Sequence, residues 1–254
     1  NAEEYFRSDS ATEERWYSTF SNSGLNNRYY STKAYNSISN KYVYEFLKEN
    51  GVYNPTQNLG ISGLDERWAL QNLLSVKYAY NARGGYGFSP VLGMEELFEN
   101  ENYLPLGFIM DKTYSKEYYL SLSTLDRQYL LLNGVVLEQE KGSADGSCES
   151  HLTVETIVRG EKGYTLKKGE KLCFLGIGYQ EKEIYIFIHG IKEVSKSSLL
   201  NVRCGNTVKQ YSFAKKGNLM YSDQRDIYLH FLNDSNDINV VTLYKTENNG
   251  SGRL

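Results

Sequence analysis

The sequence has few cysteines and no surplus of positive charge. Its 254 residues include 3 cysteines, and 28 Lys and Arg stand against 31 Asp and Glu, which gives a net charge of -3. Because nucleic-acid backbones attract strongly basic surfaces, we expect no nucleic-acid partner. Cys148, Cys173 and Cys204 lack C-x-x-C spacing and allow at most one disulfide. Cys173 and Cys204 lie in apolar, alternating stretches, which indicates small buried hydrophobic residues rather than zinc ligands.

Long apolar runs are absent as well. Residues 184–188 and 135–137 are among the longest, and they fall far short of the roughly 18–20 residues that a membrane-spanning helix needs. No segment of this chain is therefore predicted to cross a membrane. The opening Asn1-Ala2-Glu3-Glu4 lacks the basic and apolar regions of a signal peptide, and its first two residues resemble the remnant of a removed tag. We therefore expect the chain to be a segment of a longer protein.

Clear catalytic and metal-binding motifs are missing too. His151, His189 and His230 stand singly in strand patterns, without the spacing of metal ligands. Gly176-Ile177-Gly178 lacks the third glycine and the following helix of a dinucleotide site, and Gly60-Ile61-Ser62-Gly63 lacks the spacing of a nucleophile elbow. We therefore predict no catalytic residue, no metal site and no cofactor in this chain.

Acidic residues occur in pairs and in one cluster. Asp65-Glu66 and Glu95-Glu96 are adjacent carboxylates, but glycosidase chemistry depends on a separation in space that a sequence does not supply. The stretch Asn233-Asp234-Ser235-Asn236-Asp237 offers oxygen ligands for calcium, yet it contains the residues that turns favour and joins two predicted strands. We interpret the pairs as solvated faces and the cluster as a turn.

Tyrosine, in contrast, is abundant. The chain has 23 Tyr against 10 Phe and 2 Trp. The tyrosine ring combines an apolar face with a polar tip. Such usage occurs on surfaces that bind carbohydrate or protein, and equally on the half-buried strands of an ordinary β-rich protein, so composition alone leaves both interpretations open.

The spacing of apolar residues changes near the middle of the chain. In the first half it predicts helices over residues 39–50, 64–74 and 124–137, and strands over 76–80 and 97–100. The helix over 64–74 would carry Asp65 and Glu66 in its first turn. A small sheet backed by helices fits this order.

Beyond residue 150 the period of alternation is two, which is the period of a strand. Seven strands are predicted, over residues 152–158, 171–178, 183–189, 199–204, 208–213, 226–232 and 238–244. Short strands separated by turns are typical of a β-sandwich or jelly roll. We thus predict an α+β fold with a mixed helix and small-sheet part over 3–142 and an antiparallel, jelly-roll-like β-sandwich over 148–248. The Gly-, Ser- and Asp-rich residues 141–147 would join the two domains.

Several short motifs, taken in order, resemble those of a known protein family. The best markers are Val76-Lys77-Tyr78, Glu99-Asn100 and Leu104-Pro105-Leu106-Gly107-Phe108. They are accompanied by Tyr5-Phe6-Arg7, Gly24-Leu25-Asn26-Asn27, Tyr35-Asn36-Ser37-Ile38-Ser39 and Leu73-Leu74-Ser75. Together and in this order, these motifs resemble the YfhO-type bacterial membrane proteins. The resemblance covers residues 5–137, and the sandwich half matches only in kind.

The resemblance implies a polytopic membrane protein similar to the GT-C glycosyltransferases, with a large domain outside the cell. The implied activity is transfer of a sugar from a lipid-phosphate carrier to a cell-envelope polymer such as the teichoic acid of Gram-positive bacteria. The full-length protein would take a lipid-phosphate-linked sugar donor. The implied partners of this chain are the cell-envelope glycopolymer and the protein's own transmembrane part, at the extracellular face of the bacterial membrane. In such enzymes the catalytic carboxylate lies near the membrane-embedded helices, so none is expected here.

Motif positions also supply candidates for binding the phosphate or sugar of an acceptor. These are Arg7, Lys77, Tyr78 and Asn100. A structural interpretation stands beside this one, because Lys77 turns to the opposite face of its strand from Val76, and a strand lysine is commonly solvated or paired with a carboxylate. Pro105 and Gly107 would fix a bend.

Two hypotheses from different classes follow. In the first, the chain is the extracellular domain of a lipid-carrier-dependent glycosyltransferase, where it positions the acceptor or covers the active site. In the second, it is a secreted carbohydrate-binding or adhesive module without catalysis, whose tyrosine-rich sandwich stacks on sugars. A soluble glycoside hydrolase is a third interpretation.

Overall fold

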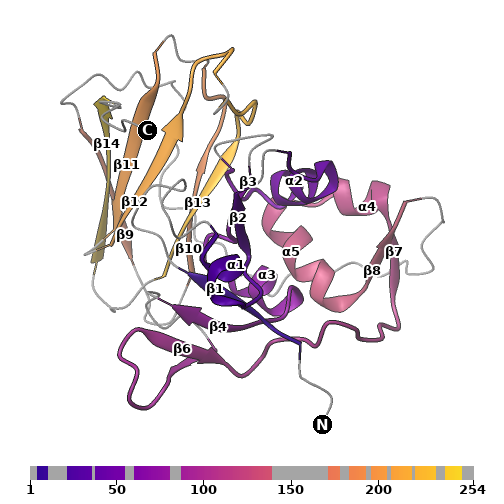
Figure 1. Ribbon diagram of the computed structural model, residues 1–254. Coiled ribbons are helices and arrows are strands. Elements are labelled where there is room, and N and C mark those ends of the chain that lie inside the picture. Colours follow the sequence, from indigo (N-terminus) through magenta and orange to yellow (C-terminus); the bar gives the residue numbers. More distant parts are fainter. Residues whose placement is uncertain are drawn as a thin grey trace.

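The fold is that of a computed structural model (Figure 1). It describes residues 5–10, 22–35, 38–54, 60–80, 87–138, 171–177, 183–192, 196–204, 207–218, 221–232 and 238–247. For 171–177 and 238–247 the backbone alone is described. The predicted strand over 152–158, His151, Cys148 and the predicted turn over 233–237 lie outside these ranges.

The first half mixes five short helices with small sheets in its described residues. The helices are α1 (Ser23–Asn27), α2 (Lys41–Glu49), α3 (Trp68–Leu73), α4 (Lys116–Ser121) and α5 (Thr124–Asn133). The strands are β1 (Arg7–Ser10), β2 (Lys33–Tyr35), β3 (Gly60–Ser62), β4 (Val76–Tyr80), β5 (Phe88–Pro90), β6 (Leu97–Asn100), β7 (Thr113–Ser115) and β8 (Val135–Leu137). The largest sheet of this half has the order β1-β4-β6-β5, in which β1 and β4 run parallel and the other pairs antiparallel.

Local chemistry explains where three helices begin. The side chain of Asn40 accepts a hydrogen bond from the Tyr42 N–H, and the hydroxyls of Ser115 and Ser123 do the same for α4 and α5. Each cap satisfies an N–H that has no partner inside its helix, which stabilises the helix by about 1 kcal/mol.

In its described residues, the second half forms two antiparallel sheets (Figure 1). Its strands are β9 (Lys171–Ile177), β10 (Glu183–Ile188), β11 (Ser198–Cys204), β12 (Thr207–Phe213), β13 (Ile227–Leu232) and β14 (Ile238–Glu247). One sheet has the order β12-β11-β14-β9 and the other pairs β10 with β13. Buried residues of both sheets, such as Val202, Leu229 and Phe231, form one core cluster, so the sheets pack face to face.

The two halves share that core. Tyr53 of the first half belongs to the sandwich cluster, and its hydroxyl donates a hydrogen bond to the Ser212 carbonyl oxygen. Two further clusters lie within the first half, around Leu70 and around Leu130. The division at 142 and 148 falls outside the described residues and stays a prediction.

The predicted α+β fold with a strand-rich second half is confirmed. The strands over 76–80 and 97–100 appear with the predicted ends. The helix predicted over 124–137 is too long, because α5 ends at Asn133 and residues 135–137 pair with β7 as strand β8. At Gly134 a side chain would collide with the Tyr114 ring and the Lys112 carbonyl oxygen, so the change of direction needs glycine.

The helix predicted from residue 64 begins later. Asp65 and Glu66 have φ values of 56° and 58°, the left-handed pair of a tight turn, and the Arg67 N–H closes that turn on the Leu64 carbonyl oxygen at 3.3 Å. Such a conformation costs about 1–2 kcal/mol at each residue other than glycine. Helix α3 starts only at Trp68.

Lys209 of β12 holds this turn. Its Nζ lies 2.8 Å from Asp65 Oδ1 and 2.9 Å from Glu66 Oε2, and all three side chains are largely buried. Burial by itself would lower the pKa of Lys209, but the two carboxylates outweigh it and hold that pKa above its ordinary value. The turn therefore joins the first half to the sandwich through a buried ion cluster, which we call the Lys209 cluster (Asp65, Glu66 and Lys209).

Arg67 extends this connection. Its side chain is completely buried, and its guanidinium donates hydrogen bonds of 2.7, 2.8 and 2.7 Å to the carbonyl oxygens of Asn50, Gly51 and Tyr228. The guanidinium also lies 5.5 Å from the centre of the Tyr185 ring. A planar group with several fixed donors suits such a junction of backbone carbonyls better than an ammonium group does.

Glu183 and His230 complete the contact between the halves. Glu183 Oε1 accepts a hydrogen bond of 2.9 Å from the Trp68 N–H at the start of α3 and lies 3.1 Å from His230 Nε2. The other ring nitrogen of His230 lies 2.8 Å from the Asp65 carbonyl oxygen. Burial would raise the pKa of Glu183, but the contacts with His230, the Trp68 N–H and the Tyr185 hydroxyl outweigh it and leave that pKa below its ordinary value.

Candidate functional site

Strand β4 places a lysine on the less buried side of the first-half sheet. Successive side chains of a strand point to opposite faces. Val76 is completely buried in the core of the first half, whereas Lys77 reaches the other face, where 17% of its side chain stays exposed. The Lys77 side chain is therefore largely enclosed by its neighbours, and a small part of it meets solvent.

Three aromatic rings surround the Lys77 ammonium group. Its Nζ lies 5.4 Å from the centre of the Tyr103 ring, 5.5 Å from that of Phe6 and 5.7 Å from that of Tyr78. Each ring attracts the cation through the negative charge on its face, by about 0.5–1 kcal/mol where the site is open to water. We call this group, together with Glu99, the Lys77 site.

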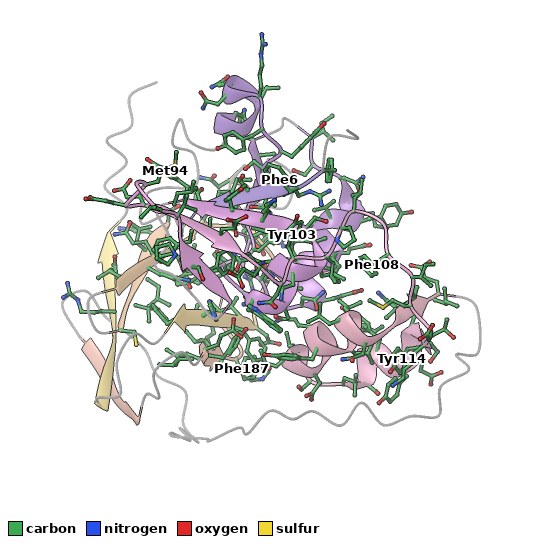
Figure 2. All side chains as sticks on the ribbon, turned by 90° about the horizontal axis from the view of Figure 1, so that it is seen from below. Phe6, Met94, Tyr103, Phe108, Tyr114 and Phe187 are labelled. Atoms are coloured by element: carbon green, nitrogen blue, oxygen red, sulfur yellow. The ribbon has the colours of Figure 1, made fainter. Side chains whose placement is uncertain are left out.

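Glu99 supplies the carboxylate of the Lys77 site. Residue 99 of β6 pairs directly with Tyr78 of β4, and the Tyr78 hydroxyl donates a hydrogen bond of 3.4 Å to Glu99 Oε1. The same oxygen lies 3.9 Å from Lys77 Nζ, which is a loose ion pair. Phe6 packs edge-on against Tyr78 at 5.3 Å. Figure 2 shows Phe6 and Tyr103 near one another on the face seen from below.

The structure brings together two of the four predicted site residues, Lys77 and Tyr78. Arg7 is held elsewhere: its guanidinium donates a hydrogen bond of 2.8 Å to the Leu74 carbonyl oxygen and lies over the Tyr5 ring. These contacts tie β1 to the end of α3. These two contacts indicate a structural role for Arg7.

Asn100 is completely buried and its amide is fully engaged. Its Nδ2 donates hydrogen bonds of 2.7 Å to Asn72 Oδ1 and 2.9 Å to the Val76 carbonyl oxygen, and its Oδ1 accepts one of 3.0 Å from the Asn102 N–H. Asn100 therefore shapes the chain that leads to Tyr103 and leaves no atom for a ligand.

Three members of the Lys77 site do not follow from sequence reasoning: Phe6, Glu99 and Tyr103. The strand patterns over residues 76–80 and 97–100 give a partial signal for Glu99, because antiparallel pairing of two strands places residues of one directly beside residues of the other. Phe6 and Tyr103 lie outside both stretches, and only the folded chain brings them to Lys77.

The arrangement is suited to binding. Aromatic faces stack on the apolar faces of sugar rings, while an ammonium group attracts phosphate and a carboxylate accepts hydrogen bonds from hydroxyls. Among the described residues we find no group of three or more His, Cys, Asp or Glu side chains placed to hold a metal ion. Within the same part of the chain, no helix combines the length and the apolar character needed to cross a membrane.

Comparison with known proteins identifies a family. The family model of the bacterial membrane protein YfhO matches residues 1–237. That match extends well into the sandwich, beyond residue 137, where the resemblance of the individual motifs ends. No curated protein and no solved structure gives a significant match. Because the family model spans most of the 254 residues, the chain belongs to the family of the bacterial membrane protein YfhO.

Proposed function

We propose that this chain is the extracellular part of a membrane glycosyltransferase that transfers a sugar from a lipid-phosphate carrier to a cell-envelope polymer such as teichoic acid. Membership of the YfhO family supports the membrane association. In this proposal catalysis belongs to the transmembrane part of the same protein, and the described domain positions the polymer or covers the active site. The donor is a lipid-phosphate-linked sugar.

The Lys77 site is the observation that carries the acceptor part of the proposal. A teichoic acid alternates polyol or sugar units with phosphates, so it presents stacking faces and negative charge at short intervals. The site offers three rings, an ammonium group and a carboxylate within one cluster of side chains. Lys77 would bind a phosphate, and Tyr103 and Phe6 would stack on an adjoining unit.

Titration of the chain with purified wall teichoic acid tests this binding directly. We expect Lys77→Gln and Tyr103→Ala each to weaken binding by about tenfold, since each removes a contact worth about 1–2 kcal/mol. Lys116→Gln is the matched control, because Lys116 also pairs with a glutamate, Glu49, and lies 5.0 Å from the centre of a tyrosine ring, Tyr119. Equal loss in the control, or no binding by the unaltered chain, would contradict the assignment of the site.

A cellular experiment tests the transferase itself. Deletion of the native gene should remove a sugar substituent from wall or lipoteichoic acid, and the full-length gene carrying Lys77→Gln should restore it only in part. If deletion leaves the sugar content of both polymers unchanged, the transferase proposal fails. Polymer binding by the Lys77 site without any change in glycosylation would instead support the alternative, a carbohydrate-binding module without catalysis.

A further inference from the structure

Five consecutive residues after β6 are exposed although none of them is polar. They are Pro105, Leu106, Gly107, Phe108 and Ile109. The exposed fractions are 58% for Leu106, 38% for Phe108 and 95% for Ile109. An uninterrupted exposed run of this kind is disfavoured in a surface that meets only water. We call residues 105–109 the apolar loop.

A second apolar projection lies at the turn between β5 and β6. Leu92 is fully exposed and Met94 is 56% exposed. Gly93 stands between them, and no described atom lies within 4 Å of the position that its Cβ would take; the same holds for Gly107 in the apolar loop. Both projections therefore extend away from the described body of the protein.

The two projections lie on the same side of the molecule. In Figure 1 the hairpin of β6 and the chain that leaves it run along the lower edge. Figure 2, seen from below, shows Met94 and Phe108 on that face with Phe6 and Tyr103 between them. The Lys77 site thus lies between two apolar projections.

We propose that this face rests on a lipid bilayer, with the apolar loop and the Leu92–Met94 turn inserted into its interfacial layer. The occupant follows from the family, whose members are membrane proteins, and from the side chains, because aliphatic tips enter the acyl boundary while tyrosines and a lysine lie at headgroup level. Glu95, Glu96 and Asp111 adjoin the projections, and Lys112 follows the loop. A face with these acidic neighbours binds lipid through apolar contact rather than through attraction to anionic headgroups.

Such docking would present the Lys77 site to the headgroup region, where the phosphate of a membrane lipid lies. The inference does not depend on the transferase proposal, because it requires only that the apolar loop and the Leu92–Met94 turn meet lipid. If the chain does not bind lipid, the proposal that the Lys77 site binds the polymer is unaffected.

Flotation of the chain with vesicles tests the docking. The test uses two kinds of vesicle, one of phosphatidylcholine alone and one of phosphatidylcholine and phosphatidylglycerol in equal parts. We expect binding to both, and binding that persists in about 1 M salt, where charge interactions are screened beyond about 3 Å. The double variant Leu106→Ser with Ile109→Ser should weaken binding by at least about tenfold, because it removes two inserted side chains.

The matched control is Leu25→Ser with Ile38→Ser. These residues are a leucine and an isoleucine with exposed fractions of 81% and 86%, and they lie on α1 and before α2. The control should bind vesicles as the unaltered chain does. Failure of the unaltered chain to bind, or an equal loss in the control, would overturn the proposal. Self-association that depends on Leu106 and Ile109, seen by sedimentation velocity without vesicle binding, would overturn it in favour of a second copy of the chain.

Discussion

Two lysines of this protein have the same kinds of neighbours and nearly the same exposure, 17% for Lys77 and 14% for Lys209, but their carboxylate partners differ. Lys77 lies 3.9 Å from a carboxylate that is 43% exposed, and three rings face its ammonium group. Lys209 lies within 2.9 Å of two largely buried carboxylates and 5.5 Å from the centre of the Phe231 ring. The first ion pair is loose and its carboxylate is open to water, whereas the second is tight and both of its carboxylates are enclosed.

The difference teaches that burial decides what a cluster of charges does. A buried pair satisfies itself, and removing one partner leaves a charge without water or counter-charge. A loose pair whose carboxylate is exposed contributes little to stability, so that carboxylate can give way to a ligand. We therefore assign the Lys209 cluster to holding the halves together and the Lys77 site to binding.

The largest expected effect comes from breaking the Lys209 cluster. Lys209→Met should lower the free energy of unfolding by about 3–5 kcal/mol, because the carboxylates of Asp65 and Glu66 stay buried without their cation and their left-handed turn loses its partner. Chemical denaturation followed by circular dichroism measures the change. Recovery of stability in a triple variant that also carries Asp65→Asn and Glu66→Gln would show that the stranded charges cause the loss.

A smaller effect concerns acid stability through Glu183. Because the folded protein holds the pKa of Glu183 below its ordinary value of 4.5, its carboxylate contributes stability that is present above pH 4.5 and is lost as pH falls through the lowered pKa. Glu183→Gln should cost about 1–3 kcal/mol at neutral pH, since an amide lacks the negative charge with which the carboxylate accepts its hydrogen bonds. It should also flatten the fall in stability below pH 4.5. The free energy of unfolding is measured by denaturation at several pH values. If its decrease below pH 4.5 is the same in the variant as in the unaltered chain, the assignment is wrong.

The smallest effect on stability is expected at Lys77. Lys77→Met should change the free energy of unfolding by less than about 1.5 kcal/mol, because the ion pair and the ring contacts are partly exposed. Measured beside Lys209→Met under the same conditions, it sharpens the comparison between the two lysines. A loss as large as that of Lys209→Met would place Lys77 among the structural residues.

Sequence patterns predict the regular parts of this fold well. The alternation over 76–80 and 97–100 coincides with β4 and β6, and the strands predicted from residue 171 onward begin within one residue of their predicted starts. Strand β14 ends at Glu247, beyond the end predicted at residue 244. Such stretches carry their own period, since one of their faces is buried. The three-residue strands β2, β3, β5, β7 and β8 were not predicted as strands, because three residues are too few to show an alternation.

The failures at Asp65 and Gly134 have tertiary causes. Acidic residues before an apolar run are typical of the first turn of a helix, yet Lys209, distant in the chain, draws Asp65 and Glu66 into a left-handed turn. The helix predicted through Gly134 ends there because the following residues find a strand partner in β7. Neither Lys209 nor β7 can be inferred as a partner from the residues that adjoin Asp65 or Gly134 in the sequence.

The sequence alone therefore determined the fold class, the strand-rich second half, the resemblance to the YfhO family and Lys77 and Tyr78 as candidates. Only the tertiary structure decided that Arg7 and Asn100 are engaged internally, that Phe6, Glu99 and Tyr103 complete the Lys77 site, and that Lys209 pairs with Asp65 and Glu66. The physical reason is range. Hydrophobic period and helix capping act over a few residues, whereas charge pairing and ring contacts join residues that only folding brings together.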